Sequence, residues 1–167
     1  MNLPENLKYT KEHEWIRLEE DGTAYIGITD YAQGELGEIV YVEVDTVGDT
    51  VDADDIFGTV EAVKTTSELF MPINGEILEF NAELDESEGD NPGLLNSAPY
   101  GKGWIVKIKV SDPEQVKELL SAADYKGLIS YIISSQFLAV YFFKKSRQHT
   151  PKLFLITSYI VNQPKED

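Results

Sequence analysis

The 167-residue sequence contains no cysteine and only two histidines. Without cysteine there are no disulfides, thiolate nucleophiles or zinc sites built on cysteine, and the composition is compatible with a reducing compartment. His13 and His149 have no cluster of ligands beside them, so we expect ordinary core or surface roles for both and predict no metal site. Phosphate-binding glycine loops and nucleophile elbows are also missing. The sequence therefore shows no residues of classical catalysis.

Basic side chains are scarce and unevenly distributed. The formal net charge is -16. Residues 1–125 hold 8 basic and 28 acidic side chains, whereas residues 126–167 hold 6 basic and 2 acidic ones. An acidic body repels phosphate backbones and can steer toward basic partner surfaces. Nucleic-acid binding is therefore not expected for residues 1–125. The alternative is that the acidity serves solubility alone.

Targeting signals are absent from the start of the sequence. Residues 1–5, MNLPE, form neither a basic segment followed by an apolar one nor an Arg-rich amphipathic pattern. We therefore expect a cytoplasmic protein made without a cleaved leader.

Alternation of apolar and polar residues indicates β-strands through the middle of the chain. In residues 104–110 one face is apolar and the other carries two lysines, as in a half-buried strand. Similar runs, separated by Gly-containing turns, occur at residues 23–28, 39–44, 56–63, 69–73 and 77–80. Several short strands at this spacing predict a compact β-sandwich or barrel.

Helices are predicted only at the periphery. Residues 30–36 could form two turns of helix. Residues 112–125 are clearer, because Ser111 and Glu114 have the spacing of a capping box and an apolar stripe follows. Gly127 is expected to end that helix.

The most informative segment is VEAVKTTSELFMPINGEI, residues 60–77. A strand leads to Lys64, a polar run follows, and the chain returns as a second strand, so Lys64 lies at or beside a hairpin tip. An exposed turn lysine of this kind is most often only solvated. A lysine that carries a swinging cofactor needs the same placement, because a modifying enzyme must reach its amine.

Five segments, in order, carry a family resemblance: LKYTKEHEW, GITDYAQGELGEIVYVEV, VEAVKTTSE, MPINGEILEFN and LLNSAPYGKGWIVKIKV. Over roughly residues 3–126 the sequence resembles the H protein of the glycine cleavage system. The resemblance implies a mainly β, barrel-sandwich hybrid fold like that of lipoyl and biotinyl domains, with short peripheral helices and a C-terminal helix. Residues 1–126 would form this lipoyl-carrier domain.

The resemblance also implies a cofactor. In that family the lysine at the position of Lys64 carries (R)-lipoic acid in amide linkage. A biotin carrier would share the hairpin, but its usual Met-Lys-Met setting is absent, since Lys64 stands between Val63 and Thr65. Lipoate on Lys64 is therefore the prediction.

The family's role implies the partners. A pyridoxal-phosphate glycine decarboxylase loads an aminomethyl group on the lipoyl arm, and a tetrahydrofolate-dependent aminomethyltransferase unloads it. Dihydrolipoamide dehydrogenase, with FAD and NAD, reoxidises the arm, and lipoyl-attachment enzymes install it. The cofactors supply the hard chemistry, so the chain would be a carrier and not an enzyme. The alternatives are a lipoyl or octanoyl relay to other enzymes and an unmodified interaction module.

Two acidic residues stand where the family holds the loaded amine. They are Glu14 and Glu68, and a carboxylate binds a protonated amine through a charge-assisted hydrogen bond. Glu68 is longer than the aspartate often found at its position, and Glu12 replaces a small polar residue. The alternative for both is a structural or solvated acid.

Residues 127–167 have no counterpart in the resemblance. Residues 127–143 are uncharged and lie at the short edge of the about 17 to 25 residues that span a bilayer, so a membrane role is not favoured. Three interpretations remain open: a remnant translated after a frameshift or altered stop codon, a membrane or partner anchor, and an ordered accessory element.

Overall fold

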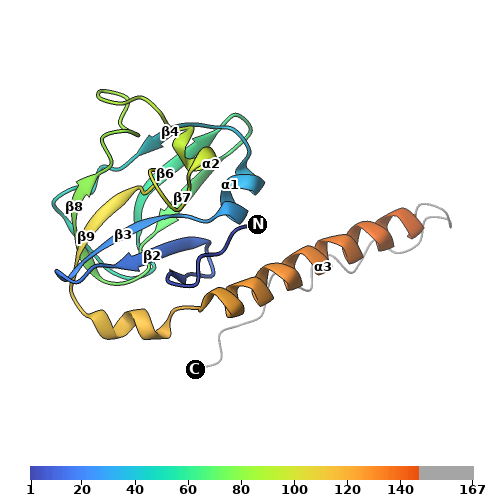
Figure 1. Ribbon diagram of the computed structural model, residues 1–167. Coiled ribbons are helices and arrows are strands. Elements are labelled where there is room, and N and C mark those ends of the chain that lie inside the picture. The colour runs from blue at the N-terminus through green and yellow to red at the C-terminus, as the bar shows by residue number, and fades with distance from the viewer. Residues whose placement is uncertain (147–167) are drawn as a thin grey trace. The chain divides into compact units, whose positions relative to one another are not determined.

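A computed structural model describes residues 1–146, which form two antiparallel sheets, three short helices and one long C-terminal helix (Figure 1). The first sheet has the strand order β1-β2-β3-β9-β8-β5 and the second has the order β4-β6-β7. The strands are β1 (Lys8–Tyr9), β2 (Glu14–Leu18), β3 (Thr23–Ile28), β4 (Ile39–Glu43), β5 (Thr50–Val51), β6 (Ile56–Ala62), β7 (Thr66–Phe70), β8 (Gly75–Phe80) and β9 (Val106–Val110). The helices are α1 (Asp30–Leu36), α2 (Leu94–Ser97), the 3-10 helix η1 (Pro113–Glu118) and α3 (Ala122–Ser146).

The core lies between the two sheets and contains apolar side chains from both. Ile26 and Ile108 of the first sheet and Val60 of the second have no exposed surface, and Leu69 of the second is 2% exposed. Val60, Leu69 and Ile108 alternate with more exposed neighbours along their strands, as expected where one face of a sheet is buried. The hairpin of β6 and β7 is thereby fixed to the core on one face.

Local sequence explains the helix that follows β3. Thr29 caps α1, and its side chain accepts a hydrogen bond from the backbone N–H of Ala32, 3.2 Å away. Such a cap satisfies one of the free donors of the first turn. Gly37, at φ 82°, follows the last residue of the helix, a backbone conformation that favours glycine. The prediction for residues 30–36 is confirmed.

One glycine lets the two neighbouring strands of the second sheet approach closely. A Cβ atom added at Gly58, in β6, would lie 2.4 Å from the backbone oxygen of Glu43, in β4. Any side chain at this position would push the strands apart. The base of the β6–β7 hairpin is therefore packed against β4 through backbone contact.

The helix predicted at residues 112–125 is wrong as a single helix. The structure has η1, a break, and then α3, which begins at Ala122. The break forms because Leu120 exchanges backbone hydrogen bonds with Tyr9 of β1, at 3.0 Å and 2.9 Å. The N-cap is also different from the one predicted. Asp112 caps η1 in place of Ser111, and its side chain accepts a hydrogen bond from the backbone N–H of Glu114. Gly127 does not end α3.

The chain divides into two units, Met1–Ile129 and Ser130–Asp167. The first unit contains both sheets, and its last buried residues, Tyr125 and Ile129, are in α3. The predicted boundary after residue 126 stays a prediction. In residues 1–146, no helix is long and apolar enough to cross a membrane.

Candidate functional site

Lys64 lies in a two-residue turn between β6 and β7. Ala62 and Thr65 close the turn with a pair of backbone hydrogen bonds, 2.8 Å from Ala62 N to Thr65 O and 3.3 Å in the reverse direction. Val63 and Lys64 are then the only residues between the paired positions. The sequence-based placement of Lys64 at the hairpin tip is what the structure shows.

A backbone hydrogen bond to a residue outside the hairpin also stabilises the turn. Two-residue hairpin loops usually need positive φ angles, but neither Val63 nor Lys64 has one. Instead, Val63 N donates to the backbone oxygen of Glu38, just before β4, across 3.0 Å. This bond fixes the turn to the third strand of its sheet, so the backbone at Lys64 is set by three neighbouring segments.

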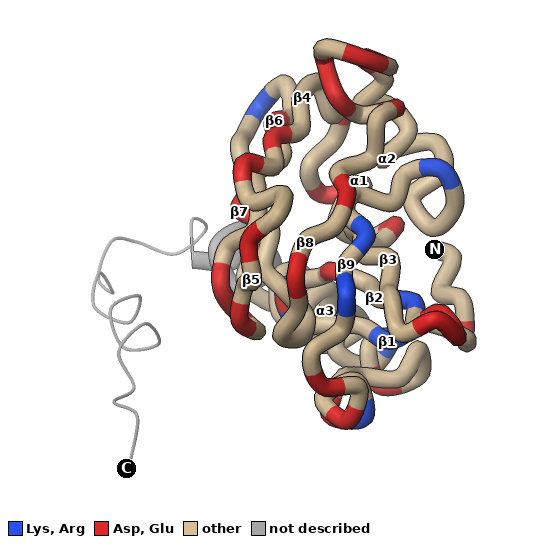
Figure 2. Tube along the Cα trace, turned by 90° about the vertical axis from the view of Figure 1, so that its left-hand side faces the viewer, with Lys and Arg blue, Asp and Glu red and all other residues tan. Residues whose placement is uncertain are grey.

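The Lys64 side chain is exposed and unpaired within the described part of the chain. Residues 61 and 63–66 are all exposed, and none of the three ion pairs found in residues 1–146 involves Lys64. Each strand of the hairpin carries one acidic residue, Glu61 in β6 and Glu68 in β7, and both strands contain red segments in Figure 2. The amine therefore projects from a fixed backbone into solvent among acidic neighbours.

Glu14, the first residue of β2, is almost completely buried, with 2% of its surface exposed. Its Oε1 accepts from the backbone N–H of Phe70, the last residue of β7, across 3.0 Å. Its Oε2 accepts a hydrogen bond from the Thr10 hydroxyl, and that hydroxyl accepts from Glu14 N at 3.0 Å. Burial raises the pKa of the Glu14 carboxyl, while these hydrogen bonds act in the opposite direction.

Glu68 has a different environment from Glu14. It is exposed, lies in β7 opposite Thr59 of β6, and is two residues from Phe70, whose N–H binds Glu14. Residues two apart in a strand point to the same face. The structure thus brings Glu14 to the strand that contains Glu68, but in residues 1–146 no hydrogen bond or ion pair joins either acid to Lys64.

Near Glu14 lies an aromatic cluster formed by the buried residues Tyr9, Tyr31 and Tyr125 and the half-buried His13. The Tyr125 hydroxyl is 2.8 Å from His13 Nδ1 and 2.8 Å from the Thr29 hydroxyl, and the Tyr125 ring stacks on Tyr9 with 4.8 Å between centroids. Burial lowers the pKa of His13, although the neighbouring acids Glu12 and Glu35 act to raise it. This cluster joins the start of α3 to the β2 corner.

No metal site is evident in the described part of the chain. Within residues 1–146, no group of three or more His, Cys, Asp or Glu side chains could hold a metal ion. His149 lies outside the described residues. The chemistry available at this surface is that of one accessible amine and the carboxylates near it.

Comparison with known proteins identifies the family. The family model described as "Glycine cleavage H-protein" matches residues 7–132. The chain belongs to the glycine cleavage H-protein family. It is similar to the glycine cleavage system H protein of Bacteroides thetaiotaomicron, with 55% identity over 130 residues that cover 78% of this chain and 99% of the relative. The corresponding protein of Chlorobaculum tepidum is 58% identical over 130 residues, which cover 77% of this chain and 98% of that protein.

A solved structure supports the same conclusion for the fold. The crystal structure of a glycine cleavage system H protein from Mycobacterium marinum matches with a TM-score of 0.67 and 37% identity, covering 76% of this chain and 98% of the other. Together with the two antiparallel sheets, this confirms the mainly β, barrel-sandwich hybrid fold with short helices and a C-terminal helix. The family expected from the sequence is confirmed as well.

Three contacts at the site were not predicted from the sequence. They are the Thr10 hydroxyl and the Phe70 N–H that bind Glu14, and the backbone oxygen of Glu38 that holds the turn. Thr10 lies within the segment LKYTKEHEW, which carries part of the family resemblance. The other two contacts use backbone atoms, which no side-chain pattern reveals.

Proposed function

We propose that this H protein carries lipoate in amide linkage on Lys64 and acts as a carrier, without turnover of its own, between the enzymes of glycine cleavage. The single observation that carries the proposal is the exposed, unpaired Lys64 at the tip of a two-residue turn in a chain of this family. When bound, the dithiolane of the lipoyl group supplies reversible redox chemistry and carries the aminomethyl group of glycine.

The residues around Lys64 suit an amide-linked arm. An attachment enzyme needs access to the amine, and the flanking exposed residues 63–66 leave the Lys64 side chain reachable. The arm then needs a fixed base, which the Ala62–Thr65 pair and the bond from Val63 N to Glu38 provide. A rigid turn limits the search of the arm to rotations of the lysine side chain and the arm itself.

The acidic body supports transient docking of several partners. Residues 1–125 carry 28 acidic and 8 basic side chains, and such an excess steers basic surfaces toward the carrier. We propose that glycine decarboxylase, the aminomethyltransferase, dihydrolipoamide dehydrogenase and the lipoyl-attachment enzymes each use this attraction. Their rates of association should fall as the salt concentration rises.

Glu14 and Glu68 are proposed to hold the protonated amine of the carried group. An ionised carboxylate has about four lone-pair sites, so Glu14 retains acceptor capacity beyond its bonds to Phe70 and Thr10. Glu68 presents an exposed carboxylate on β7, two residues from Phe70. Glu14→Gln and Glu68→Gln should therefore release the carried group to water faster than wild type does. Equal hydrolysis rates in all three proteins would contradict this role.

Reconstituted glycine cleavage tests the carrier function directly. The lipoylated full chain should support continuous formation of carbon dioxide, ammonia and methylenetetrahydrofolate from glycine and tetrahydrofolate when the decarboxylase and the aminomethyltransferase are added, together with dihydrolipoamide dehydrogenase and NAD to reoxidise the dithiol after each turnover. Lys64→Arg keeps the positive charge and removes the amine that forms the amide, so it should give only background rates. Lys102→Arg, at another exposed lysine, is the matched control and should be active. Activity of Lys64→Arg would contradict the proposal.

A further inference from the structure

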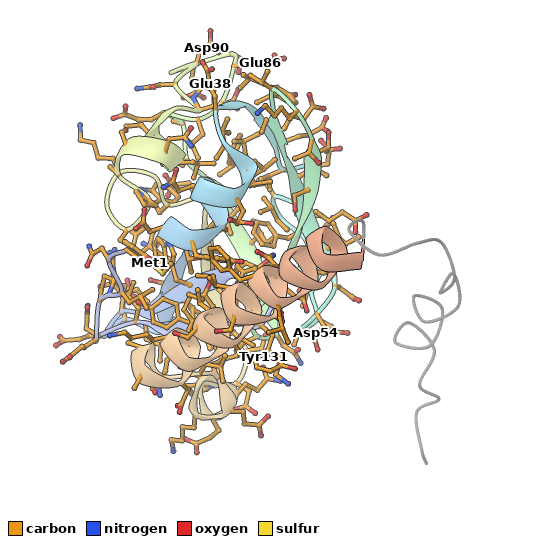
Figure 3. All side chains as sticks on the ribbon, turned by 90° about the vertical axis from the view of Figure 1, so that its right-hand side faces the viewer. Met1, Glu38, Asp54, Glu86, Asp90 and Tyr131 are labelled. Carbon is orange, nitrogen blue, oxygen red and sulfur yellow. The ribbon has the colours of Figure 1, made fainter. Side chains whose placement is uncertain are left out.

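After residue 129, α3 presents a group of exposed apolar side chains. Tyr131 and Phe137 are each 73% exposed and Leu138 is 61% exposed, and Ile133 between them is also exposed. Figure 3 labels Tyr131 on this helix. Exposed apolar residues elsewhere in residues 1–129 are spread singly along the sequence, and such single residues are normal on a protein surface. Four exposed apolar residues within the eight residues 131–138 are more than is usual on a protein surface.

Two of the polar side chains in this part of α3, Ser134 and Ser135, bond back to the helix. The Ser134 hydroxyl donates to the backbone oxygen of Ser130 at 2.6 Å, and the Ser135 hydroxyl donates to that of Ile132 at 2.7 Å. Hydroxyl groups satisfied in this way do not need water, which is how serine is accommodated in helices that contact lipid. The helix can therefore enter an apolar environment without losing these bonds.

The exposed apolar residues lie on two sides of the helix, with Tyr131 and Leu138 on one side and Ile133 and Phe137 on the other. Successive residues are about 100° apart around an α-helix, so Tyr131 and Ile133 point about 160° apart and Phe137 and Leu138 about 100° apart. A helix that binds a protein groove uses one stripe at i, i+3, i+4 and i+7, but the positions three and four after Tyr131 are Ser134 and Ser135. An apolar medium that contacts several faces suits this pattern better.

Positive charge follows the apolar segment. Lys144 and Lys145 are at the end of α3 and Arg147 comes next in the sequence. Residues 126–167 hold 6 basic and 2 acidic side chains, in contrast to the acidic residues 1–125. Anionic lipid headgroups attract basic segments of this kind and repel acidic surfaces. The net positive charge of residues 126–167 is thus complementary to an anionic membrane, whereas the net negative charge of residues 1–125 is not.

The length of the segment distinguishes surface binding from spanning. Residues 128–143 contain no charged side chain, and sixteen residues of α-helix measure about 24 Å, less than the about 30 Å of a bilayer core. The part of the chain that the structure describes contains no spanning helix. The family model ends at residue 132, so most of this segment lies outside the shared H-protein domain.

We propose that residues 128–146 bind the surface of lipid bilayers that contain anionic headgroups, with the apolar residues at the level of the acyl chains and the basic residues at the headgroups. The H-protein domain would then act while held at a membrane. This inference is independent of lipoylation at Lys64, and it revises the expectation that a membrane role is unlikely.

Vesicle flotation tests the proposal on the full chain. Vesicles of phosphatidylglycerol and phosphatidylcholine in equal parts should carry the protein upward in a density gradient, whereas aggregated protein sinks. Phe137→Asp should weaken binding by about tenfold or more, because it places a charge among acyl chains. Val47→Asp makes the same kind of change at an exposed apolar residue of the body and should leave binding unchanged. Lys144→Glu with Lys145→Glu should weaken binding to the mixed vesicles.

Two results would overturn the proposal. One is a full chain that stays at the bottom of the gradient at every vesicle concentration. The other is a full chain that forms dimers without vesicles by light scattering, becomes monomeric in Phe137→Asp, and does not float, since a second copy of the chain would then cover the helix. Flotation that requires phosphatidylglycerol and decreases with added salt supports the proposal.

Discussion

Lys64 and Glu14 illustrate two opposite ways of fixing a functional side chain near one strand, β7. At Lys64 every described contact is made by the backbone of the turn, and the side chain is exposed. At Glu14 the carboxylate is buried, and both of its oxygens accept hydrogen bonds. The lysine proposed to carry a moving arm is thus positioned by backbone bonds nearby, whereas the buried glutamate is positioned by bonds to its own side chain. The two should respond differently to substitution.

The largest expected effect on stability follows loss of the Glu14 carboxylate. Glu14→Ala leaves the Phe70 N–H and the Thr10 hydroxyl without their acceptor in a buried place, and it opens a cavity. Each buried polar group left without a partner costs about 1–3 kcal/mol, and two such groups remain, so the free energy of unfolding should fall by about 2–6 kcal/mol. Urea unfolding measures it.

Glu68→Ala is the matched control for Glu14→Ala. Its side chain is exposed, and exposed substitutions usually change stability by less than about 0.5 kcal/mol. Equal losses in the two variants would show that Glu14 does not join β2 to β7 as the structure indicates.

Tyr125→Phe is expected to have the second largest effect. It removes the hydroxyl that lies 2.8 Å from both His13 Nδ1 and the Thr29 hydroxyl, while the ring can still stack on Tyr9. Loss of hydrogen bonds of this type costs about 0.5–1.5 kcal/mol each. Thermal unfolding followed by circular dichroism measures the change. A melting temperature equal to that of wild type would contradict a role for this hydroxyl in fixing the start of α3.

The pH dependence of stability gives a second contrast between buried and exposed side chains. His13 is half-buried, so its protonation should be linked to folding. Burial lowers its pKa below the ordinary 6.5, so the unfolded state takes up the proton first as the pH falls. The contribution of His13 to stability should be present above that ordinary value and lost as the pH falls through the folded pKa. His13→Asn is a suitable reference, since asparagine tolerates the positive φ of 78° at this position.

Unfolding of wild type and His13→Asn at about pH 8 and about pH 5 measures this effect. The stability of wild type relative to the variant should be smaller at the lower pH. A difference that stays constant, or increases, would contradict burial of a neutral imidazole.

The smallest expected effect on stability is that of Lys64→Arg. No described ion pair involves the Lys64 side chain, and the turn is closed by backbone bonds that arginine retains. The free energy of unfolding should change by less than about 0.5 kcal/mol. A larger loss in urea unfolding would mean that the lysine side chain supports the fold.

Local patterns were sufficient for several elements of the fold. Residues 23–28 and 30–36 match β3 and α1, because alternation and a threonine cap act within a few residues. The strand predicted at residues 69–73 is shifted, since β7 begins at Thr66. Its first residues are polar and exposed, so they lack the apolar alternation that reveals a strand; they are paired through β6 instead.

The site could be predicted from the sequence only in part. Lys64 was found because two strands and a polar run define a hairpin tip within a short segment. The partners of Glu14 and Tyr125 could not be found in this way. Phe70 is 56 residues from Glu14, and Tyr125 is 112 residues from His13. Such long-range polar contacts depend on how the sheets pack together and leave no periodic pattern in one sequence.

Peptide mapping of the full chain after expression in cells that make lipoate tests the central claim most directly. Mass spectrometry should find the lipoyl mass increment on the peptide that contains Lys64, and the increment should be absent from Lys64→Arg and present in Lys102→Arg. An unmodified Lys64 in cells whose other lipoate-dependent proteins are fully lipoylated, or the increment on a different lysine, would contradict the account.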